Sequence, residues 1–240
     1  MAFDIIETRK IVTENYNCAK TKLALIKHAH FVESAQAISD VIPGYEARHM
    51  EFGDYLQDNF TPLFIDIRSS TLRAISIGPE KTFLSMHAFF PAVCNVVEQH
   101  GGYIIDFMGD GIMALFGGRE SGLPKGYSSK QAGLCGLSLL EVVNTVINPL
   151  LDEDKIWKFS CGVGIDYGSV IVTKIGTKDN YDVKAFGNCI NGASKLSKSD
   201  NEVVVSDEVH KLWPSSKDGK MRFNILKFGE LIGYVLNRSA

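Results

Sequence analysis

The sequence predicts an α+β domain in which helices cover one face of an antiparallel sheet. Three observations support this fold class: apolar strand-like runs alternate with helical stretches from residue 61 onward, two of the runs flank a Gly-Asp-Gly turn, and the elements follow the order β-α-β-β-α-β. The composition agrees, since 45% apolar and 22% charged residues in a chain of 240 are typical of a folded soluble protein.

The first part of the chain differs from the rest. Residues 21–40 place apolar side chains at roughly helical spacing, and Pro43-Gly44 ends this pattern. We therefore expect residues 1–58 to form a helical N-terminal extension and residues 59–240 to form the principal domain.

A strand and a helix are expected next. Residues 62–67 (PLFIDI) are almost wholly apolar, which predicts a short strand at a buried central position of the sheet. Ser69, Ser70 and Thr71 follow, and these residue types cap helix N-termini. Apolar residues recur at helical spacing over residues 82–100, which predicts a helix that Gly101-Gly102 ends.

The remaining elements complete the order. Residues 103–108 and 112–116 are strand-like runs joined by Gly109-Asp110-Gly111, which predicts a tight β-hairpin. A loop is expected at residues 117–129. The later expected elements are an amphipathic helix at 131–147, strands at 158–167, 169–175, 203–205 and 232–236, and a polar helix at 188–198.

Several functional classes are disfavoured. The five cysteines are scattered without a CxxC pair, as expected for reduced thiols in a cytoplasmic protein. Residues 1–10 are charged and do not resemble a signal peptide, and no apolar run approaches the roughly 18 residues of a membrane span. The net charge of −3 gives no electrostatic reason to bind a nucleic acid. We expect a cytoplasmic protein without direct membrane association.

Two aspartates are candidate metal ligands. Asp66 is the one charged residue of an apolar strand, where a carboxylate is costly unless it is paired or bound to metal. Asp110 lies at the tip of the hairpin expected beside that strand. Two such carboxylates suit Mg²⁺ or Mn²⁺, and the Ile67 carbonyl could add a neutral ligand. Taken singly, Asp66 could be a strand-end cap and Asp110 a turn residue.

The start of the next helix offers a place for phosphate. Arg68, Ser69, Ser70 and Thr71 are expected to present free backbone N–H groups at a helix N-terminus. A phosphate chain bound there would lie beside the metal on Asp66 and Asp110.

These segments together resemble a known family. Residues 64–71 (FIDIRSST), 100–102 (HGG), 107–117 (FMGDGIMALFG), 162–168 (GVGIDYG) and 186–196 (FGNCINGASKL) are similar, in order and spacing, to the class III adenylate and guanylate cyclase domain. The resemblance covers roughly residues 62–236. It implies a ferredoxin-like core, a head-to-tail homodimer with active sites at the interface, and two divalent cations on Asp66, Ile67 and Asp110. The implied reaction is attack of the ribose 3′-hydroxyl on the α-phosphorus of a nucleoside triphosphate, which releases pyrophosphate.

The resemblance also assigns roles to residues of the second protomer. Asn191 would orient the ribose and the α-phosphate, and Lys227 would bind the triphosphate. Lys195 stands where the family has an arginine that stabilises charge on phosphorus. Lysine keeps the charge but lacks the planar two-donor fork, so we expect either a slower reaction or a cation supplied from elsewhere.

Two further residues fall at the positions that read the base. Adenylate cyclases of the family have lysine and then aspartate or threonine there, whereas this chain has Asp106 and Lys184. An aspartate acceptor and a lysine donor match N3–H and the carbonyls of uracil, match guanine in part, and could accommodate cytosine. Adenine N1 would face a carboxylate, which is unfavourable. Alternatively, Asp106 and Lys184 form an ion pair across the dimer interface and read no base.

With these departures, the chain resembles the pyrimidine cyclases of the bacterial anti-phage Pycsar systems. We therefore expect a uridylate cyclase that converts UTP to cyclic UMP and pyrophosphate, as a messenger for a separate effector protein in antiviral signalling. The alternatives are a cytidylate cyclase, a guanylate or adenylate cyclase, and a cyclase-like domain that only binds a nucleotide or a partner.

Overall fold

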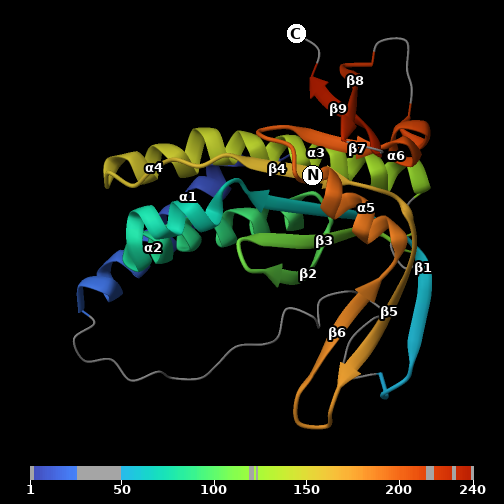
Figure 1. Cartoon of the computed structure of the whole chain (residues 1–240), viewed down its shortest axis with the longest axis horizontal. Coiled ribbons are helices and arrows are strands. Elements are labelled where there is room, and N and C mark those ends of the chain that lie inside the picture. Colours follow the sequence, from blue (N-terminus) through green and yellow to red (C-terminus); the bar gives the residue numbers. More distant parts are fainter. Residues whose placement is uncertain are drawn as a thin grey trace.

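The computed structural model describes residues 3–25, 50–118, 122, 124–214, 219–228 and 231–238, which form one mixed sheet and the helices packed on it (Figure 1). The strands are β1 (Tyr55–Ile67), β2 (Tyr103–Met108), β3 (Gly111–Gly117), β4 (Cys161–Ile165), β5 (Gly168–Gly176), β6 (Tyr181–Phe186), β7 (Val203–Ser206), β8 (Met221–Phe228) and β9 (Leu231–Arg238). The helices are α1 (Ile5–Leu25), α2 (Ser70–Gln99), α3 (Lys125–Val142), the π-helical segment η4 (Val143–Ile147), α4 (Asn148–Glu153), α5 (Asn188–Leu196) and α6 (Asp207–Leu212).

Strand β1 is the centre of the sheet, whose order is β2-β3-β1-β4-β7-β9-β8. The C-terminal half of β1 pairs antiparallel with β3 and β4, and its N-terminal half pairs antiparallel with β5, which in turn pairs with β6. The sequence predicted a strand only from residue 62. The strand begins at Tyr55 because residues 55–59, although largely exposed and polar, are hydrogen-bonded to β5.

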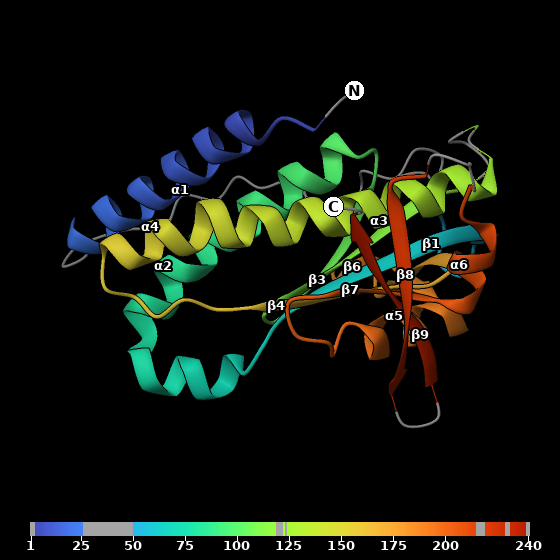
Figure 2. The same cartoon turned by 90° about the horizontal axis from the view of Figure 1, so that it is seen from above.

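The two faces of β1 bury different sets of side chains. Leu63, Ile65 and Ile67 belong to the large core beneath α1, α2 and α3. Phe60 and Phe64 belong to a smaller core that α5, β5 and β6 complete on the opposite face. Figure 2 shows α1 and α3 on one side of the sheet and α5 on the other. This arrangement confirms the predicted α+β class, with the difference that α5 covers the second face.

Helix α2 is longer than predicted and is kinked. It begins at Ser70, and Gly78 interrupts it with φ 80° and ψ 171°, directly before Pro79. Ser69 lies in the left-handed region with φ 52° and makes no capping hydrogen bond through its side chain. Ser69 is thus the N-cap residue of α2, at the place expected, but its side chain does not cap the helix, because the turn from β1 uses a left-handed backbone conformation.

The next helical stretch is also longer than predicted, and it shortens the expected loop. α3, η4 and α4 run on from residue 125 to residue 153, whereas the sequence predicted residues 131–147. Residues 126–153 form a helical stretch that is long and apolar enough to cross a membrane. However, α3 packs on β1, β3 and β4, and 61% of the most apolar 18-residue part of the stretch is buried inside the protein. Packing in the core therefore explains why this stretch is apolar.

Four features were not predicted. These are the strands β6 and β8, the short helix α6, and the parallel pairing of β4 with β7 in a sheet expected to be antiparallel. The strand expected at 158–167 is shorter, at Cys161–Ile165.

Helix α1 contributes to the main core of the protein. It packs against α2, with Val12, Tyr16 and Ala19 buried. Most of the helix expected at residues 21–40 lies outside the described residues. The division of the chain at residue 58 stays a prediction.

Candidate active site

The structure brings Asp66 and Asp110 together, as predicted. Asp66 is the last residue of β1 that pairs with β3, opposite Gly111, and the Ile67 main-chain N–H donates to the Asp110 carbonyl at 3.4 Å. A Cβ atom on Gly111 would lie only 2.8 Å from the Ile65 carbonyl oxygen, so glycine lets the turn approach the strand this closely. Burial and then the neighbouring charge of Asp110 raise the pKa of Asp66. The two carboxylates therefore repel each other.

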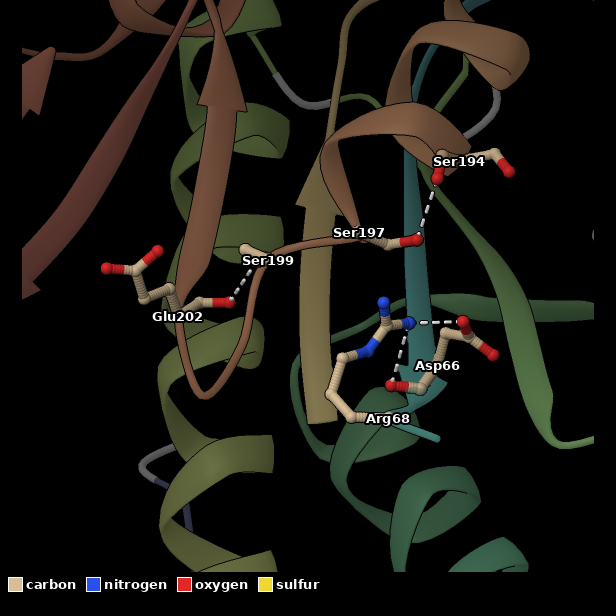
Figure 3. A network of polar contacts seen from close by, with 6 residues as sticks. All are labelled: Asp66, Arg68, Ser194, Ser197, Ser199 and Glu202. Atoms are coloured by element: carbon tan, nitrogen blue, oxygen red, sulfur yellow. Dashed lines mark hydrogen bonds and ion pairs between the residues drawn. The ribbon is translucent and has the colours of Figure 1, made fainter. Parts of the chain in front are cut away.

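Arg68 partly balances this repulsion. Its Nη2 donates to Oδ2 of the Asp66 carboxylate and, at 3.4 Å, to the Asp66 main-chain carbonyl (Figure 3). This contact acts to lower the pKa of Asp66, but burial and Asp110 outweigh it. The backbone N–H of Arg68 donates to the Ser160 carbonyl at 2.9 Å, so it is not one of the free N–H groups expected for phosphate.

A cavity of about 450 Å³ adjoins Asp110. Its lining includes Ile67, Ser70, Thr71 and Asp110. Arg68 and Ser69 instead line a neighbouring cavity of about 330 Å³, beside Trp157. Of the four residues expected to cradle phosphate, Ser70 and Thr71 thus share a cavity with Asp110.

This donor set fits a hard divalent cation. Two carboxylates and a nearby main-chain carbonyl are oxygen ligands of the kind Mg²⁺ and Mn²⁺ prefer, and water and substrate phosphates usually complete such sites. The described residues contain no cluster of three or more His, Cys, Asp or Glu that could hold a metal alone. A cation between Asp66 and Asp110 would remove the repulsion that raises the pKa of Asp66.

Asp106 and Lys184 are in direct contact within one chain. Lys184 Nζ lies 2.6 Å from Oδ2 of Asp106 and 2.9 Å from Oδ2 of Asp182. Burial acts to lower the pKa of Lys184, but hydrogen bonds to both carboxylates outweigh it and raise the pKa. The expected ion pair thus exists, although it joins β2 to β6 of the same chain and does not cross an interface. Sequence reasoning missed Asp182 because it did not predict β6.

The residues expected on the second protomer lie apart from the carboxylates. Asn191 and Lys195 are exposed on α5 and are four residues apart, so they lie on the same side of that helix. Lys227 is exposed on β8, in the hairpin with β9 that projects from the sheet in Figure 1. Among the contacts of the described residues, none joins these three side chains to Asp66 or Asp110.

Glycines set the position of α5. A Cβ atom on Gly164 would lie 2.0 Å from the Ala193 carbonyl oxygen, and one on Gly162 would lie 2.1 Å from the Ser197 carbonyl oxygen. The motif at residues 162–168 therefore allows α5 to lie directly on β4. Figure 3 shows the end of α5, with Ser194 and Ser197, above the strand that carries Asp66.

A comparison with protein families decides the relationship. The family described as the adenylate and guanylate cyclase catalytic domain matches residues 54–236. The chain belongs to this cyclase family.

The curated relatives include both adenylate cyclases and guanylate cyclases. An adenylate cyclase of Anabaena cylindrica is 27% identical over 180 residues, which cover 74% of this chain and 34% of the relative. The receptor-type guanylate cyclase gcy-2 of Caenorhabditis elegans is 23% identical over 207 residues, which cover 80% of this chain and 18% of the relative. The chain spans about a third or less of the length of these relatives.

Solved structures show the same fold for the cyclase. The adenylyl cyclase CyaB from P. aeruginosa has a TM-score of 0.69 at 21% identity, with 78% of this chain and 97% of that chain covered. The guanylyl cyclase Cya2 has a TM-score of 0.67 at 21% identity, with 79% and 96% covered. The expected class III cyclase fold is therefore confirmed, and this fold occurs with either purine.

Proposed function

We propose that this cyclase is a uridylate cyclase, which converts UTP to 3′,5′-cyclic UMP and pyrophosphate at sites shared by two protomers. The observation that carries the proposal is the contact of Asp106 with Lys184 at the position where the family reads the base. That contact places a hydrogen-bond acceptor, Asp106, beside a donor, Lys184, where β2 meets β6.

The base is inferred from the hydrogen-bonding capacity of this pair. Asp106 uses Oδ2 for Lys184 in the described contacts, and Oδ1 is left to accept a hydrogen bond. Uracil presents N3–H between two carbonyls, so one edge fits both the acceptor and the remaining lysine N–H. Cytosine and adenine present a ring nitrogen acceptor there, which a carboxylate disfavours. Cytosine remains the next candidate because its amino group could donate to Asp106, and guanine, which fits in part, follows.

The phosphates are bound on the other side of the site. Asp66, Asp110 and the Ile67 carbonyl would hold two divalent cations, which supply positive charge and activate the attacking hydroxyl when bound. Ser70 and Thr71 line the adjoining cavity and would bind phosphate oxygens through the helix start. These residues would hold the substrate by its triphosphate.

The second protomer would supply the remaining groups. Asn191 orients the ribose, and Lys195, one helical turn away, stabilises charge developing on the α-phosphorus. Lys227 binds the far end of the triphosphate. The family resemblance implies a head-to-tail homodimer, in which these exposed side chains of one chain complete the site of the other.

Lysine at position 195 favours a second candidate function, a domain that binds a nucleotide without turnover. The convergence of Asp66 and Asp110 supports catalysis, since a binding module does not need two carboxylates that repel each other.

The role of cyclic UMP as a messenger for a separate effector in antiviral signalling rests on the resemblance to the Pycsar cyclases. A rise in cyclic UMP after phage infection of cells that carry the gene would support it, and an unchanged level would contradict it.

One experiment separates these functions. The purified protein is incubated with Mn²⁺ and each of the four ribonucleoside triphosphates, and the products are identified by mass spectrometry. Cyclic UMP is the expected main product. Cyclic AMP as the main product would contradict the base assignment, and no product from any triphosphate in a dimeric preparation would favour the binding module.

A further inference from the structure

Lys184 lies between two carboxylates, of which the family resemblance accounts for one. Asp182 and Lys184 are two residues apart on β6 and therefore point to the same face of the strand, while Asp106 reaches them from β2. The side chains of Asp106, Lys184 and Asp182 are 31%, 27% and 43% exposed. A ligand can therefore reach this cluster, and solvent only partly screens its charges.

Two carboxylates hold Lys184 in place. Both favour the protonated form of Lys184 and raise its pKa. An ammonium group has three N–H donors, and Asp106 and Asp182 each accept one. Lys184 is thereby held from two sides, with one N–H donor left.

We propose that Asp182 is a positioning residue that sets base specificity through Lys184. It makes the cluster select nucleoside triphosphates whose base presents a ring N–H beside a carbonyl oxygen, as uracil does at N3–H, over bases that present a ring acceptor. This inference rests on the proposed function and deepens it, because it explains discrimination between UTP and CTP.

The discrimination follows from the position in which Lys184 is held. A ring N–H facing Asp106 forms a charge-assisted hydrogen bond, whereas the N3 lone pair of cytosine is repelled by that carboxylate. With Asp182 replaced by asparagine, Lys184 exchanges a charge-assisted hydrogen bond for a weaker neutral one and is held less firmly. Lys184 can then turn its donor towards cytosine N3, which removes part of the penalty against CTP.

The test compares Asp182→Asn with the wild-type chain. Affinities for 3′-deoxy-UTP and 3′-deoxy-CTP, which lack the attacking hydroxyl, are measured by calorimetry with Mg²⁺, and kcat/KM is measured for UTP and CTP with Mn²⁺. The preference for the uracil nucleotide over the cytosine nucleotide should fall about ten-fold, since a hydrogen bond to a charged group contributes this much in affinity. Most of the change should lie in the affinities and KM.

Two variants serve as controls. Asp182→Glu keeps the charge and should retain most of the preference. Asp179→Asn removes an exposed carboxylate in the turn between β5 and β6 that has no described contact to Lys184, and it should leave the preference unchanged. Thermal unfolding verifies that each variant is folded.

The outcomes for Asp182 and for the proposed function can be told apart. A uracil-to-cytosine preference of Asp182→Asn within about two-fold of wild type, in a folded protein, would overturn the role of Asp182. Cyclic AMP as the main wild-type product would overturn the proposed function instead. The ratio of the affinities for 3′-deoxy-UTP and 3′-deoxy-CTP, compared between Asp182→Asn and wild type, would still test the role of Asp182 separately.

Discussion

Asp66 is held in an environment that opposes its own charge. It is partly buried, Asp110 is close, and its contact with Arg68 offsets these effects only in part, so the pKa of Asp66 lies above its ordinary value of 3.8. A carboxyl group with a raised folded-state pKa stabilises the fold below its unfolded pKa. That contribution is lost as pH rises through the folded-state pKa. The metal-free protein should therefore lose stability as pH rises above 3.8, and a bound cation should restore it.

Asp110→Asn tests this residue pair. Without divalent cations the variant should unfold at a higher temperature than wild type at neutral pH, because the repulsion on Asp66 is gone. Mn²⁺ should raise the unfolding temperature of wild type but not of the variant, and turnover should fall at least about a thousand-fold. Thermal unfolding from pH 4 to 8 with EDTA or Mn²⁺ measures the first two effects.

Asp152→Asn is the control for Asp110→Asn. It changes an exposed carboxylate paired with Lys158 and should alter neither the unfolding temperature, nor its response to Mn²⁺, nor turnover. If Mn²⁺ stabilised Asp110→Asn as much as wild type, the metal assignment would be refuted.

Lys195 gives a second prediction at this scale. Lys195→Arg should raise kcat about ten-fold, because a planar guanidinium donates two hydrogen bonds where lysine offers a point charge. Lys195→Ala should leave little or no turnover, because it removes the charge altogether. Steady-state kinetics with the preferred triphosphate measure both. Lys198→Arg, at another exposed lysine just after α5, is the matched control. An arginine variant no faster than wild type would show that the charge comes from another group.

At the scale of elements, α5 packs so closely on β4 that Gly164 leaves no room for a side chain. Gly164→Ala should lower the free energy of unfolding by about 1–3 kcal/mol, because its Cβ atom would lie 2.0 Å from a backbone oxygen that can move only with α5. Turnover should fall as well, since Asn191 and Lys195 move with the helix.

Urea unfolding and turnover measure these two effects of Gly164→Ala. Gly168→Ala is the milder control, because its nearest neighbour would be a side-chain carbon 3.1 Å away. Full turnover in Gly164→Ala would show that α5 is not held in place by this contact.

The elements also show what the sequence can and cannot predict. The hairpin of β2 and β3 was predicted because apolar runs flank a turn of defined chemistry, and its register brings Asp110 beside Asp66. The N-terminal half of β1, β6 and β8 were not predicted, because many of their side chains are exposed and hydrogen bonds to distant strands define them. Asp182 was missed for this reason: its partner Lys184 is only two residues away in sequence, but the strand that places both side chains on one face depends on pairing with β5.

At the scale of the whole molecule, the proposed site is shared by two chains, each of which contributes residues that the other lacks at that site. Asp66→Ala and Lys195→Ala should each be inactive or nearly so as homodimers. Mixed in equal amounts and allowed to exchange subunits, they should recover about one quarter of wild-type activity, because half of the dimers are mixed and each of these has one intact site. Turnover before and after mixing measures this recovery. Mixing two batches of Asp66→Ala is the control, and no recovery in a mixture shown to exchange would contradict the shared site.

The peripheral position of β6 has a consequence for the history of such proteins. Within the described sheet β6 is hydrogen-bonded to β5 alone, and Asp182 and Lys184 are partly exposed on it, whereas Asp66 lies in the central strand. Surface substitutions usually change stability by only about 0.5 kcal/mol, so mutations on this hairpin are tolerated more easily than those around Asp66. If Asp106, Lys184 and Asp182 select the base as proposed, a lineage can alter which nucleotide it cyclises without changing the residues that hold the metal ions.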